Sequence, residues 1–199
     1  MTDRKKQILQ TAIEITAIQG YGNLTMRALA RASDLKLGAL QYHFPTSEDM
    51  LRAMVEYVSD TYASSFEALR NRKGSLRIRD IVLFMFDDEA GKPLMGDRLW
   101  PQLWAMQQIE PLVSDLVDDI FAQGIKTLEG ALEHAGVSAP RGEALCLMSL
   151  IEGSTIFIGH GRRWVRNKKI LRDTMLQLVD DRYGESRVPP VEPKRVKQR

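Results

Sequence analysis

The chain has 199 residues, of which 44% are apolar and 27% are charged, with 28 Lys and Arg against 26 Asp and Glu. This composition suits a packed core and excludes a chain that is disordered throughout. The longest unbroken apolar run has six residues, Ile81 to Phe86. That is far short of the roughly 20 residues that span a bilayer, so no membrane contact is expected.

The start of the chain and its single cysteine indicate the cytoplasm. The first ten residues are basic but lack the apolar core and the small-residue cleavage site of a secretory signal peptide. Cys146, the single cysteine, lies in an apolar stretch. We therefore expect a buried, inert thiol that suits a reducing compartment.

The sequence carries no pattern typical of catalysis. His43, His134 and His160 fall in different predicted elements, with no Glu or Cys at ligand spacing, so we expect no metal site. The P-loop, Gly-x-Ser-x-Gly and Gly-x-Gly-x-x-Gly motifs are absent from the sequence. We therefore expect neither an enzyme nor a protein with a cofactor.

Charge is spread unevenly along the chain. The formal net charge is +3 in residues 1–46, −5 in residues 47–181 and +4 in residues 182–199. Affinity for a polyanion depends on the local density of Lys and Arg rather than on the total. The pattern suits a protein with one end facing a polyanion, although ordinary scatter of charge explains it equally well.

Apolar residues recur every three or four positions through most of the chain, which predicts an all-α fold of about nine helices. Thr25 and Ser47 are the expected N-caps of the second and fourth helices, and Pro111 and Pro140 open two later ones. Residues 75–88 are the one ambiguous element, because the run Ile81 to Phe86 also suits a buried strand, but no partner strand exists elsewhere, so we predict a helix. At about 1.5 Å per residue the fourth helix is a rod of roughly 39 Å, long enough to link two domains. The predicted helices cover residues 4–19, 26–33, 37–43, 47–72, 75–88, 94–109, 111–135, 140–158 and 167–183.

Residues 25–44 hold the most informative pattern. Two short helices, joined by the three residues 34–36 and preceded by a stabilising helix, have the spacing of a helix-turn-helix. The second of them would enter the major groove of DNA, with Leu40 and Phe44 packed inward. Gln41 can pair with adenine, and Lys36 can reach guanine or phosphate. A three-helix core that binds no ligand is the alternative interpretation of this spacing.

The same segment resembles the N-terminal domain of TetR-type transcriptional regulators. The resemblance covers about 50 residues and implies an all-helical homodimer with one helix-turn-helix per subunit. It also implies a C-terminal domain that binds a small molecule and thereby lowers the affinity for DNA. The motifs that carry it are Ile8-Leu9-x-x-Ala12, Gly20-Tyr21, Thr25-Met26-x-x-Leu29-Ala30, Leu35-x-x-Gly38-Ala39-Leu40, Tyr42-His43-Phe44 and Glu48-Asp49-x-Leu51.

Three positions depart from the family's pattern. Asp34 stands where the family usually has Gly in the turn, and it adopts the left-handed conformation at a higher energetic cost than Gly does. Lys36 replaces a common Ser or Thr cap, and Gln41 replaces a frequent Tyr, so Gln41 contacts either a phosphate or a base. Tyr42 and His43 match the family's phosphate contacts. The residues expected to contact DNA are Thr25, Arg27, Lys36, Leu37, Gly38, Ala39, Gln41, Tyr42 and His43.

The C-terminal half resembles the family in architecture, and Leu99-Trp100-x-x-Leu103-Trp104-Ala105 resembles a segment of many members. Its aromatic residues either line an apolar effector pocket or pack as plain core. Asp87-Asp88-Glu89 could attract a cationic effector, but we expect a solvated helix end. The candidate effector contacts are Phe84, Trp100, Trp104, Met106, Phe121 and Phe157.

The eighth predicted helix is apolar on two sides. One side can face its own core and the other a partner subunit, with Gly153 allowing close approach. The last helix supplies further apolar positions. The candidate dimer contacts are Leu147, Leu150, Ile151, Gly153, Leu171, Met175 and Leu178.

These patterns predict a dimeric DNA-binding repressor that a largely apolar small-molecule effector releases from operator DNA. The expected parts are a helix-turn-helix domain (1–46), a ligand-binding and dimerisation domain (47–184) and a disordered basic tail (185–199). The alternative is a helical dimerisation or adaptor module whose helix-turn-helix does not bind DNA. A steep salt dependence of DNA binding would separate the two, because neutralised phosphates release counterions.

Overall fold

The computed structural model describes residues 2–73 and 76–184, and within these ranges the chain has nine α-helices and no strand. The all-α prediction is confirmed, including a helix in the ambiguous segment. Short 3-10 turns cover Tyr21–Asn23, Lys92–Leu94 and Val165–Asn167. The helices are α1 (Asp3–Gln19), α2 (Met26–Ala32), α3 (Leu37–His43), α4 (Ser47–Lys73), α5 (Ile78–Phe86), α6 (Gly96–Met106), α7 (Pro111–His134), α8 (Pro140–Ile158) and α9 (Lys168–Tyr183).

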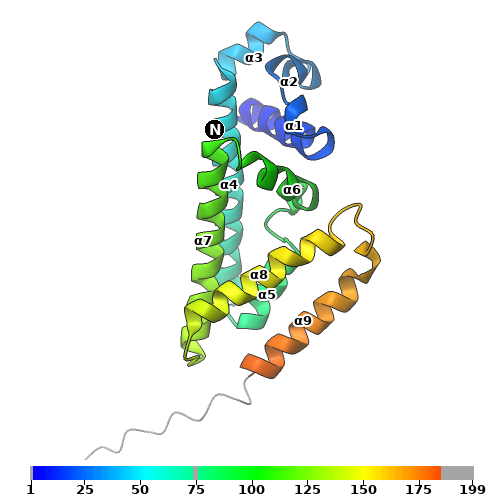
Figure 1. The fold of residues 1–199 in the computed structure, drawn as a ribbon. Coiled ribbons are helices and arrows are strands. Elements are labelled where there is room, and N and C mark those ends of the chain that lie inside the picture. Colours follow the sequence, from blue (N-terminus) through cyan, green and yellow to red (C-terminus); the bar gives the residue numbers. More distant parts are fainter. Residues whose placement is uncertain (1, 74–75, 185–199) are drawn as a thin grey trace, which may run out of the picture.

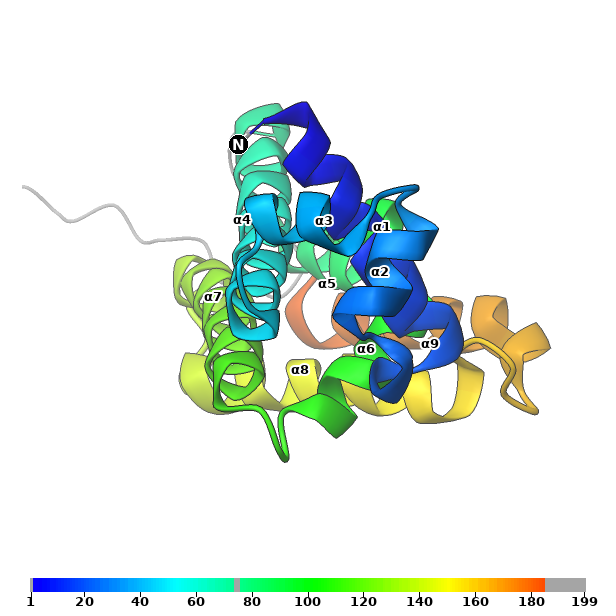
Figure 2. The same cartoon turned by 90° about the horizontal axis from the view of Figure 1, so that it is seen from above.

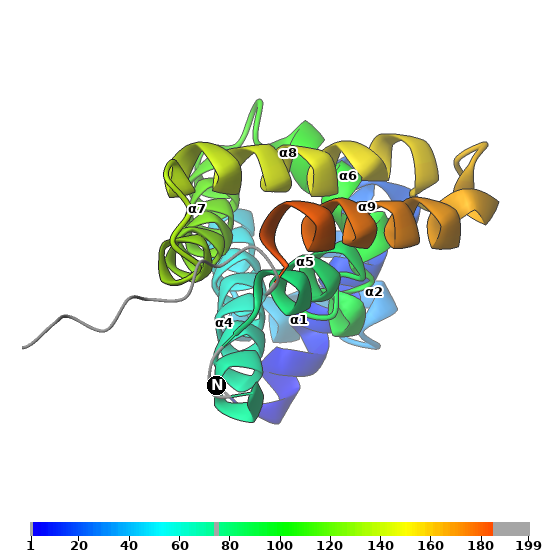
Figure 3. The ribbon, with the colours of Figure 1, turned by 90° about the horizontal axis from the view of Figure 1, so that it is seen from below.

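Helices α4 and α7 form the long axis of the molecule (Figure 1). They pack side by side and run in the same direction, away from the end that carries α1, α2 and α3. At that end α1 rests on α6, and α2 and α3 lie outermost (Figure 2). At the other end α8 and α9 run in opposite directions, connected through the turn at Val165–Asn167, and α5 packs against both of them (Figure 3).

The helix-turn-helix has the predicted geometry. Thr25 caps α2, because its Oγ1 accepts a hydrogen bond from the backbone N of Ala28 at 3.1 Å. The turn places Asp34 at φ +53°, the left-handed region in which Gly costs least. Leu40 and Phe44 are buried, as expected for the inner side of α3. Short-range chemistry therefore sets the relative position of α2 and α3.

One apolar core extends from the helix-turn-helix into the long axis. Ile8 of α1, Leu29 of α2 and Leu40 of α3 belong to the same cluster of buried residues as Met54 of α4 and Val117 of α7. A second cluster joins α5, α8 and α9 to the far half of α7. The helices on either side of residue 46 are therefore packed against one another through a shared core.

The N-cap of α4 is Thr46, and the prediction of Ser47 is wrong. The backbone N of Asp49 donates to Thr46 Oγ1 at 3.0 Å, and the backbone N of Thr46 donates to Asp49 Oδ2 at 3.1 Å. Such a reciprocal capping box needs the acceptor carboxylate three residues after the cap. Asp49 stands at that distance from Thr46 and not from Ser47.

Cys146 is exposed, so the prediction of a buried thiol is wrong. It lies on α8 with Leu150 and Phe157, which are 47% and 53% exposed. Of the two apolar sides of α8, one packs against the described residues of its own chain, and Cys146 belongs to the other. Among the described residues no helix is both long and apolar enough to cross a membrane.

The capping box gives a direct test of the entry into α4. We expect Thr46→Ala to lower the free energy of unfolding by about 1 kcal/mol, because it leaves a helix N–H without its acceptor. Urea denaturation followed by circular dichroism measures the difference. Ser47→Ala is the matched control and should change stability by less than about 0.5 kcal/mol. A larger loss with Ser47→Ala than with Thr46→Ala would contradict this cap assignment.

Candidate DNA-binding surface and effector cavity

The outer side of α3 carries polar and aromatic side chains that make few contacts with their own chain. Tyr42 is 86% exposed, and its only ring contact among the described residues is an edge-on one with His43 at 5.5 Å between centroids. Gln41 and Lys36 are exposed as well. An exposed tyrosine of this kind has its hydroxyl free for a partner molecule.

The nine residues expected to contact DNA all lie on α2, on α3 or at their N-caps. Thr25 is exposed and also caps α2. Leu37 and His43 are half-buried, so part of each side chain packs against its own chain. Lys36 and Arg27 make no ion pair with any described residue, which leaves both cations available. The remaining expected contacts are exposed: Gly38, Ala39, Gln41 and Tyr42.

A cavity of about 450 Å³ lies among α4, α5, α6, α7 and α8, and α1 reaches its edge with Ala17 and Ile18. Three of the six expected effector contacts, Phe84, Trp100 and Phe121, line it. The rings of Trp100 and Phe121 are stacked with centroids 5.6 Å apart. The cavity therefore has an aromatic wall.

The other three expected effector contacts do not line this cavity. Met106 is 1% exposed and lies in the first core, against which Trp104 also packs. Phe157 lies on the outer side of α8, where its ring faces Trp164 at 6.0 Å. Helical spacing indicates that a residue is apolar and periodic, but it does not say which of two apolar faces turns toward a cavity.

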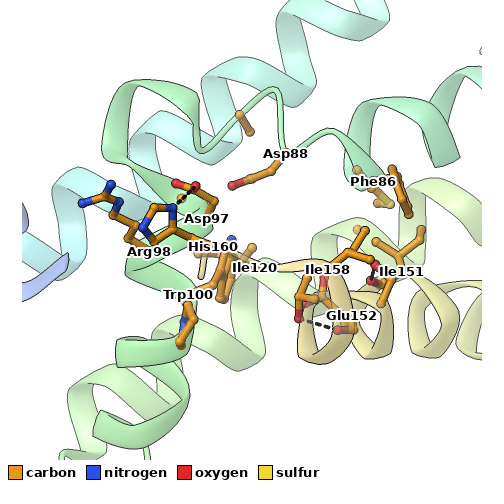
Figure 4. A pocket seen from close by; sticks show the side chains of 18 of the residues that line it. Phe86, Asp88, Asp97, Arg98, Trp100, Ile120, Ile151, Glu152, Ile158 and His160 are labelled. Atoms are coloured by element: carbon orange, nitrogen blue, oxygen red, sulfur yellow. Dashed lines mark hydrogen bonds and ion pairs between the residues drawn. The ribbon is translucent and has the colours of Figure 1, made fainter. Parts of the chain in front are cut away.

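Tyr62 of α4 links the aromatic wall to a carboxylate. Its hydroxyl accepts a hydrogen bond from Trp100 Nε1 at 2.7 Å and donates one to Asp88 Oδ1 at 2.9 Å. The backbone N of Gly91 also donates to Asp88 Oδ1, at 3.1 Å. The expected solvated helix end at residues 87–89 is thus wrong for Asp88, whose side chain turns inward to the cavity (Figure 4).

The loop around Asp88 is shaped to hold this carboxylate. Asp88 itself adopts φ +46°, and Met95 adopts φ +56°, both in the left-handed region that residues other than Gly rarely occupy. A Cβ at Gly91 would lie 2.2 Å from Asp88 Oδ2, and one at Gly96 would lie 1.8 Å from the same atom. Only glycine therefore leaves room for the carboxylate at these two positions.

Glu152 of α8 brings a second carboxylate to the cavity (Figure 4). Its side chain has no hydrogen bond or ion pair with any described residue. Burial raises the pKa of Glu152 to about 7, and the negative charge of Asp88 adds to the effect. Burial likewise raises the pKa of Asp88 to about 6, against the lowering effect of its hydrogen bonds from Tyr62 and Gly91. Glu152 is not among the effector contacts expected from the sequence, since nothing near it in the sequence marks it as buried.

The charged groups at the rim are more exposed than these two. Asp97 and the ring of His160 approach to 3.8 Å, with side chains 63% and 52% exposed. Lys168 lies near Asp87 at 3.9 Å. Arg98 and Arg162 complete the charged rim. The cavity is therefore acidic and aromatic inside, with its cations at the entrance.

The seven expected dimer contacts divide into two groups. Leu150 and Leu178 are exposed and point away from the core of their own chain, and Gly153 and Leu171 are half-buried. Leu147, Ile151 and Met175 are at most 5% exposed and belong to the second core. Within the described part of the chain no group of three or more His, Cys, Asp and Glu side chains could hold a metal ion.

The raised pKa of Glu152 has a consequence for stability. A carboxyl whose pKa is higher in the folded chain stabilises the fold at pH values below its unfolded pKa, and that contribution is lost as pH rises to the folded value. We therefore expect Glu152→Gln to match the parent near pH 4.5 and to be more stable above about pH 7. Thermal unfolding across this range measures the difference.

The exposed Glu133 provides the matched control on α7. Glu133→Gln should leave the difference in melting temperature from the parent independent of pH. If the melting temperatures of the parent and of Glu152→Gln depend on pH in the same way, Glu152 is not an ionised carboxylate buried in the folded chain above pH 7.

Comparison with known proteins agrees with this geometry. Residues 8–54 match the family model described as bacterial regulatory proteins, tetR family. The HTH-type transcriptional regulator YuxN of Bacillus subtilis is 30% identical over 60 residues, which span 30% of this chain and 21% of that protein. The nucleoid occlusion factor SlmA of Marinomonas sp. is 23% identical over 158 residues, 76% of this chain and 80% of that protein.

Solved structures extend the likeness to the whole fold. A TetR transcriptional regulator from Legionella pneumophila superposes with a TM-score of 0.68 at 19% identity, over 92% of this chain and 98% of that one. A transcriptional regulator from Saccharomonospora viridis, solved in complex with choline, gives 0.71 at 21% identity over 91% and 95%. The chain therefore carries the helix-turn-helix of the tetR family of bacterial regulatory proteins, on the all-helical fold of solved TetR regulators.

Proposed function

We propose that this protein is a homodimeric repressor of transcription that a small-molecule effector releases from operator DNA. The observation that carries the proposal is the outer side of α3, where Tyr42 is 86% exposed in a helix-turn-helix of this family. Such a face has polar groups for phosphates and bases and no role in its own core. Because operator DNA of bacteria lies in the cytoplasm, the protein would act there.

The proposed division of labour follows the sequence. Residues 1–46 would bind DNA, and residues 47–184 would bind the effector and the second subunit. The expected basic tail, residues 185–199, lies outside the described residues. The two described parts share one apolar core, which supports transmission between them by packing rather than by a flexible linker.

The outer sides of α8 and α9 are the proposed dimer interface, with a second copy of this chain as the partner. They expose an apolar strip that includes Leu150, Ile156 and Phe157 of α8 and Ile170 and Leu178 of α9. Monomeric proteins rarely expose a continuous apolar area of this kind. A symmetric pair of α8–α9 hairpins would bury it and would present two copies of α3 to one duplex.

The cavity is the proposed effector site. Tyr62 and Phe66 of α4 line it, and α4 begins four residues after the end of α3. An effector that shifts α4 would change the separation of the two α3 helices. Their fit to major grooves about 34 Å apart, or a multiple of that distance, would then be lost. A structural neighbour solved with choline supports a small molecule at this fold.

The alternative is an adaptor whose helix-turn-helix does not bind DNA. Binding of the purified protein to its own upstream intergenic DNA, measured at several salt concentrations, separates the two. A repressor should bind tightly, with an affinity that falls steeply with salt as counterions are released. Absence of binding at low salt, before and after removal of small molecules by partial unfolding and refolding, would favour the adaptor.

The phosphate-facing pair provides the first test of the DNA surface. Tyr42→Phe and His43→Ala should each weaken binding about 2- to 10-fold on every sequence, because each removes a hydrogen-bonding group without a base partner. Fluorescence anisotropy with operator and unrelated duplexes measures this loss. Tyr183→Phe and His134→Ala are the controls and should leave binding unchanged, because these residues end α9 and α7, whose C-terminal ends lie far from α3 (Figure 1).

Gln41 distinguishes recognition of bases from contact with phosphates. If Gln41 pairs with a base, Gln41→Ala should weaken operator binding by about 1–3 kcal/mol and unrelated DNA much less, which relaxes the sequence preference. The same anisotropy assay compares the two duplexes. An equal loss on both would assign Gln41 to a phosphate.

The dimer proposal predicts a change in mass. Leu150→Asp and Phe157→Asp should convert the dimer to monomer, because each places a charge in an apolar interface. They should also lower operator affinity at least about tenfold, since the two half-sites no longer bind together. Sedimentation velocity measures the mass. Ile109→Asp, at a position between α6 and α7 that is 69% exposed, is the control. A dimer that persists in both interface variants would place the interface elsewhere.

A further inference from the structure

The cavity contains two carboxylates that lack a cationic partner in the described chain. Neither Asp88 nor Glu152 forms an ion pair with a described Lys, Arg or His. Both side chains lie among apolar and aromatic groups, and burial of a charge in such surroundings is unfavourable unless it is paired. An inward-facing pair of acids is therefore a feature that the packing of the chain does not explain.

The position of Asp88 is well defined. Its Oδ1 accepts hydrogen bonds from the hydroxyl of Tyr62 and from the backbone N of Gly91. The left-handed backbone of Asp88 turns the carboxylate inward, and the absence of a Cβ at Gly91 and Gly96 leaves room for it. Such preorganisation, at the cost of backbone strain, is typical of a binding site.

We infer that the cavity binds an organic monocation with apolar substituents, with its charged centre between Asp88 and Glu152 and its substituents against the aromatic wall. This inference rests on the proposed function, since it assigns a chemical class to the proposed effector. It replaces the largely apolar effector expected from the sequence. The volume of about 450 Å³ admits a molecule considerably larger than a single trimethylammonium group.

Other ligand classes fit the interior less well. An anion would meet two carboxylates, and the cations that would attract it lie at the exposed rim. A neutral apolar molecule would leave both acids without a cationic partner. A metal ion needs more ligands than the site offers, because no cluster of three ligating side chains occurs among the described residues. Aromatic faces add attraction for a cation, especially a weakly hydrated one.

The same contacts connect the ligand to the long helix α4. A cation beside Asp88 competes for the negative charge that now accepts the hydrogen bond of Tyr62, and Tyr62 also accepts from Trp100 in the wall. Occupancy would therefore reposition a residue of α4 directly. Because a cation favours the ionised carboxylates, binding should also release protons wherever Asp88 or Glu152 is still protonated.

The test compares a cation with a neutral molecule of the same shape. Choline carries a positively charged nitrogen where 3,3-dimethylbutan-1-ol has a neutral carbon atom. A third probe, benzyltrimethylammonium, adds an aromatic group to the cation. Isothermal titration calorimetry on the full-length protein should give at least about tenfold tighter binding for choline than for the alcohol. Titration in two buffers of different ionisation enthalpy should show protons released near pH 6.5, and cation affinity should rise as pH increases.

Three variants assign the effect to the interior acids. Glu152→Gln should weaken cation binding about tenfold, leave the alcohol within about twofold, and reduce the pH dependence. Asp88→Asn should behave similarly. Glu133→Gln, at an exposed position of α7 outside the cavity, is the matched control and should bind like the parent. The pH dependence that remains in Glu152→Gln is assigned to Asp88, whose pKa burial raises to about 6. The other charged or titratable groups around the cavity are Tyr62, Asp97, Arg98, His160, Arg162 and Lys168.

The outcomes separate this inference from the proposed function. Equal binding of choline and the alcohol, or binding of neither cation at millimolar concentration, overturns the cation assignment and leaves operator binding untouched. Cation binding that Glu152→Gln and Asp88→Asn do not weaken also overturns it. If the parent shows no salt-dependent binding to DNA, the proposed repressor function is refuted, whatever the calorimetry shows.

Discussion

The hydroxyl of Tyr62 is the polar contact that joins the long helix α4 to the interior of the cavity. It lies on α4, the next helix after α3, and joins Trp100 to Asp88 within the cavity. A hydroxyl with one donor and one acceptor partner has little freedom to move without breaking a bond in a region of low dielectric. Under the proposed function, the charge state of the cavity would act on α4 through this hydroxyl and on α3 through α4.

Much of the fold was predictable because neighbouring residues decide it. The helix-turn-helix needs Thr25 as a cap, Asp34 in a left-handed turn and Leu40 on the inner side, and each of these follows from local chemistry. Helix boundaries at Pro111 and Pro140 follow for the same reason. The cap of α4 was harder to predict, because Thr46 and Ser47 are adjacent and both residue types are good N-caps. Only the hydrogen bond to the carboxylate of Asp49 selects Thr46.

The cavity was predictable only in part. Trp100 and Phe121 lie in its wall, whereas Trp104, of the same aromatic type and on the same helix as Trp100, packs in the core. Asp88 looked like an exposed acid because its burial depends on Tyr62, which is distant in the sequence. The two glycines at 91 and 96 were the available signal, and their meaning appears only with the carboxylate between them. On α8, similarly, periodicity found two apolar faces but could not tell which one the chain buries.

The apolar core that α1, α2 and α3 share with α4 and α7 also limits how modular the molecule is. Regulators with new specificities are often sought by joining the DNA-binding head of one protein to the sensor of another. In this chain a junction at residue 46 would cut through a packed interior, leaving Met54 and Val117 against foreign side chains. A working chimera would have to transplant the matching surfaces of α1, α4, α6 and α7 together, so the unit of exchange is a packed interface rather than a stretch of sequence.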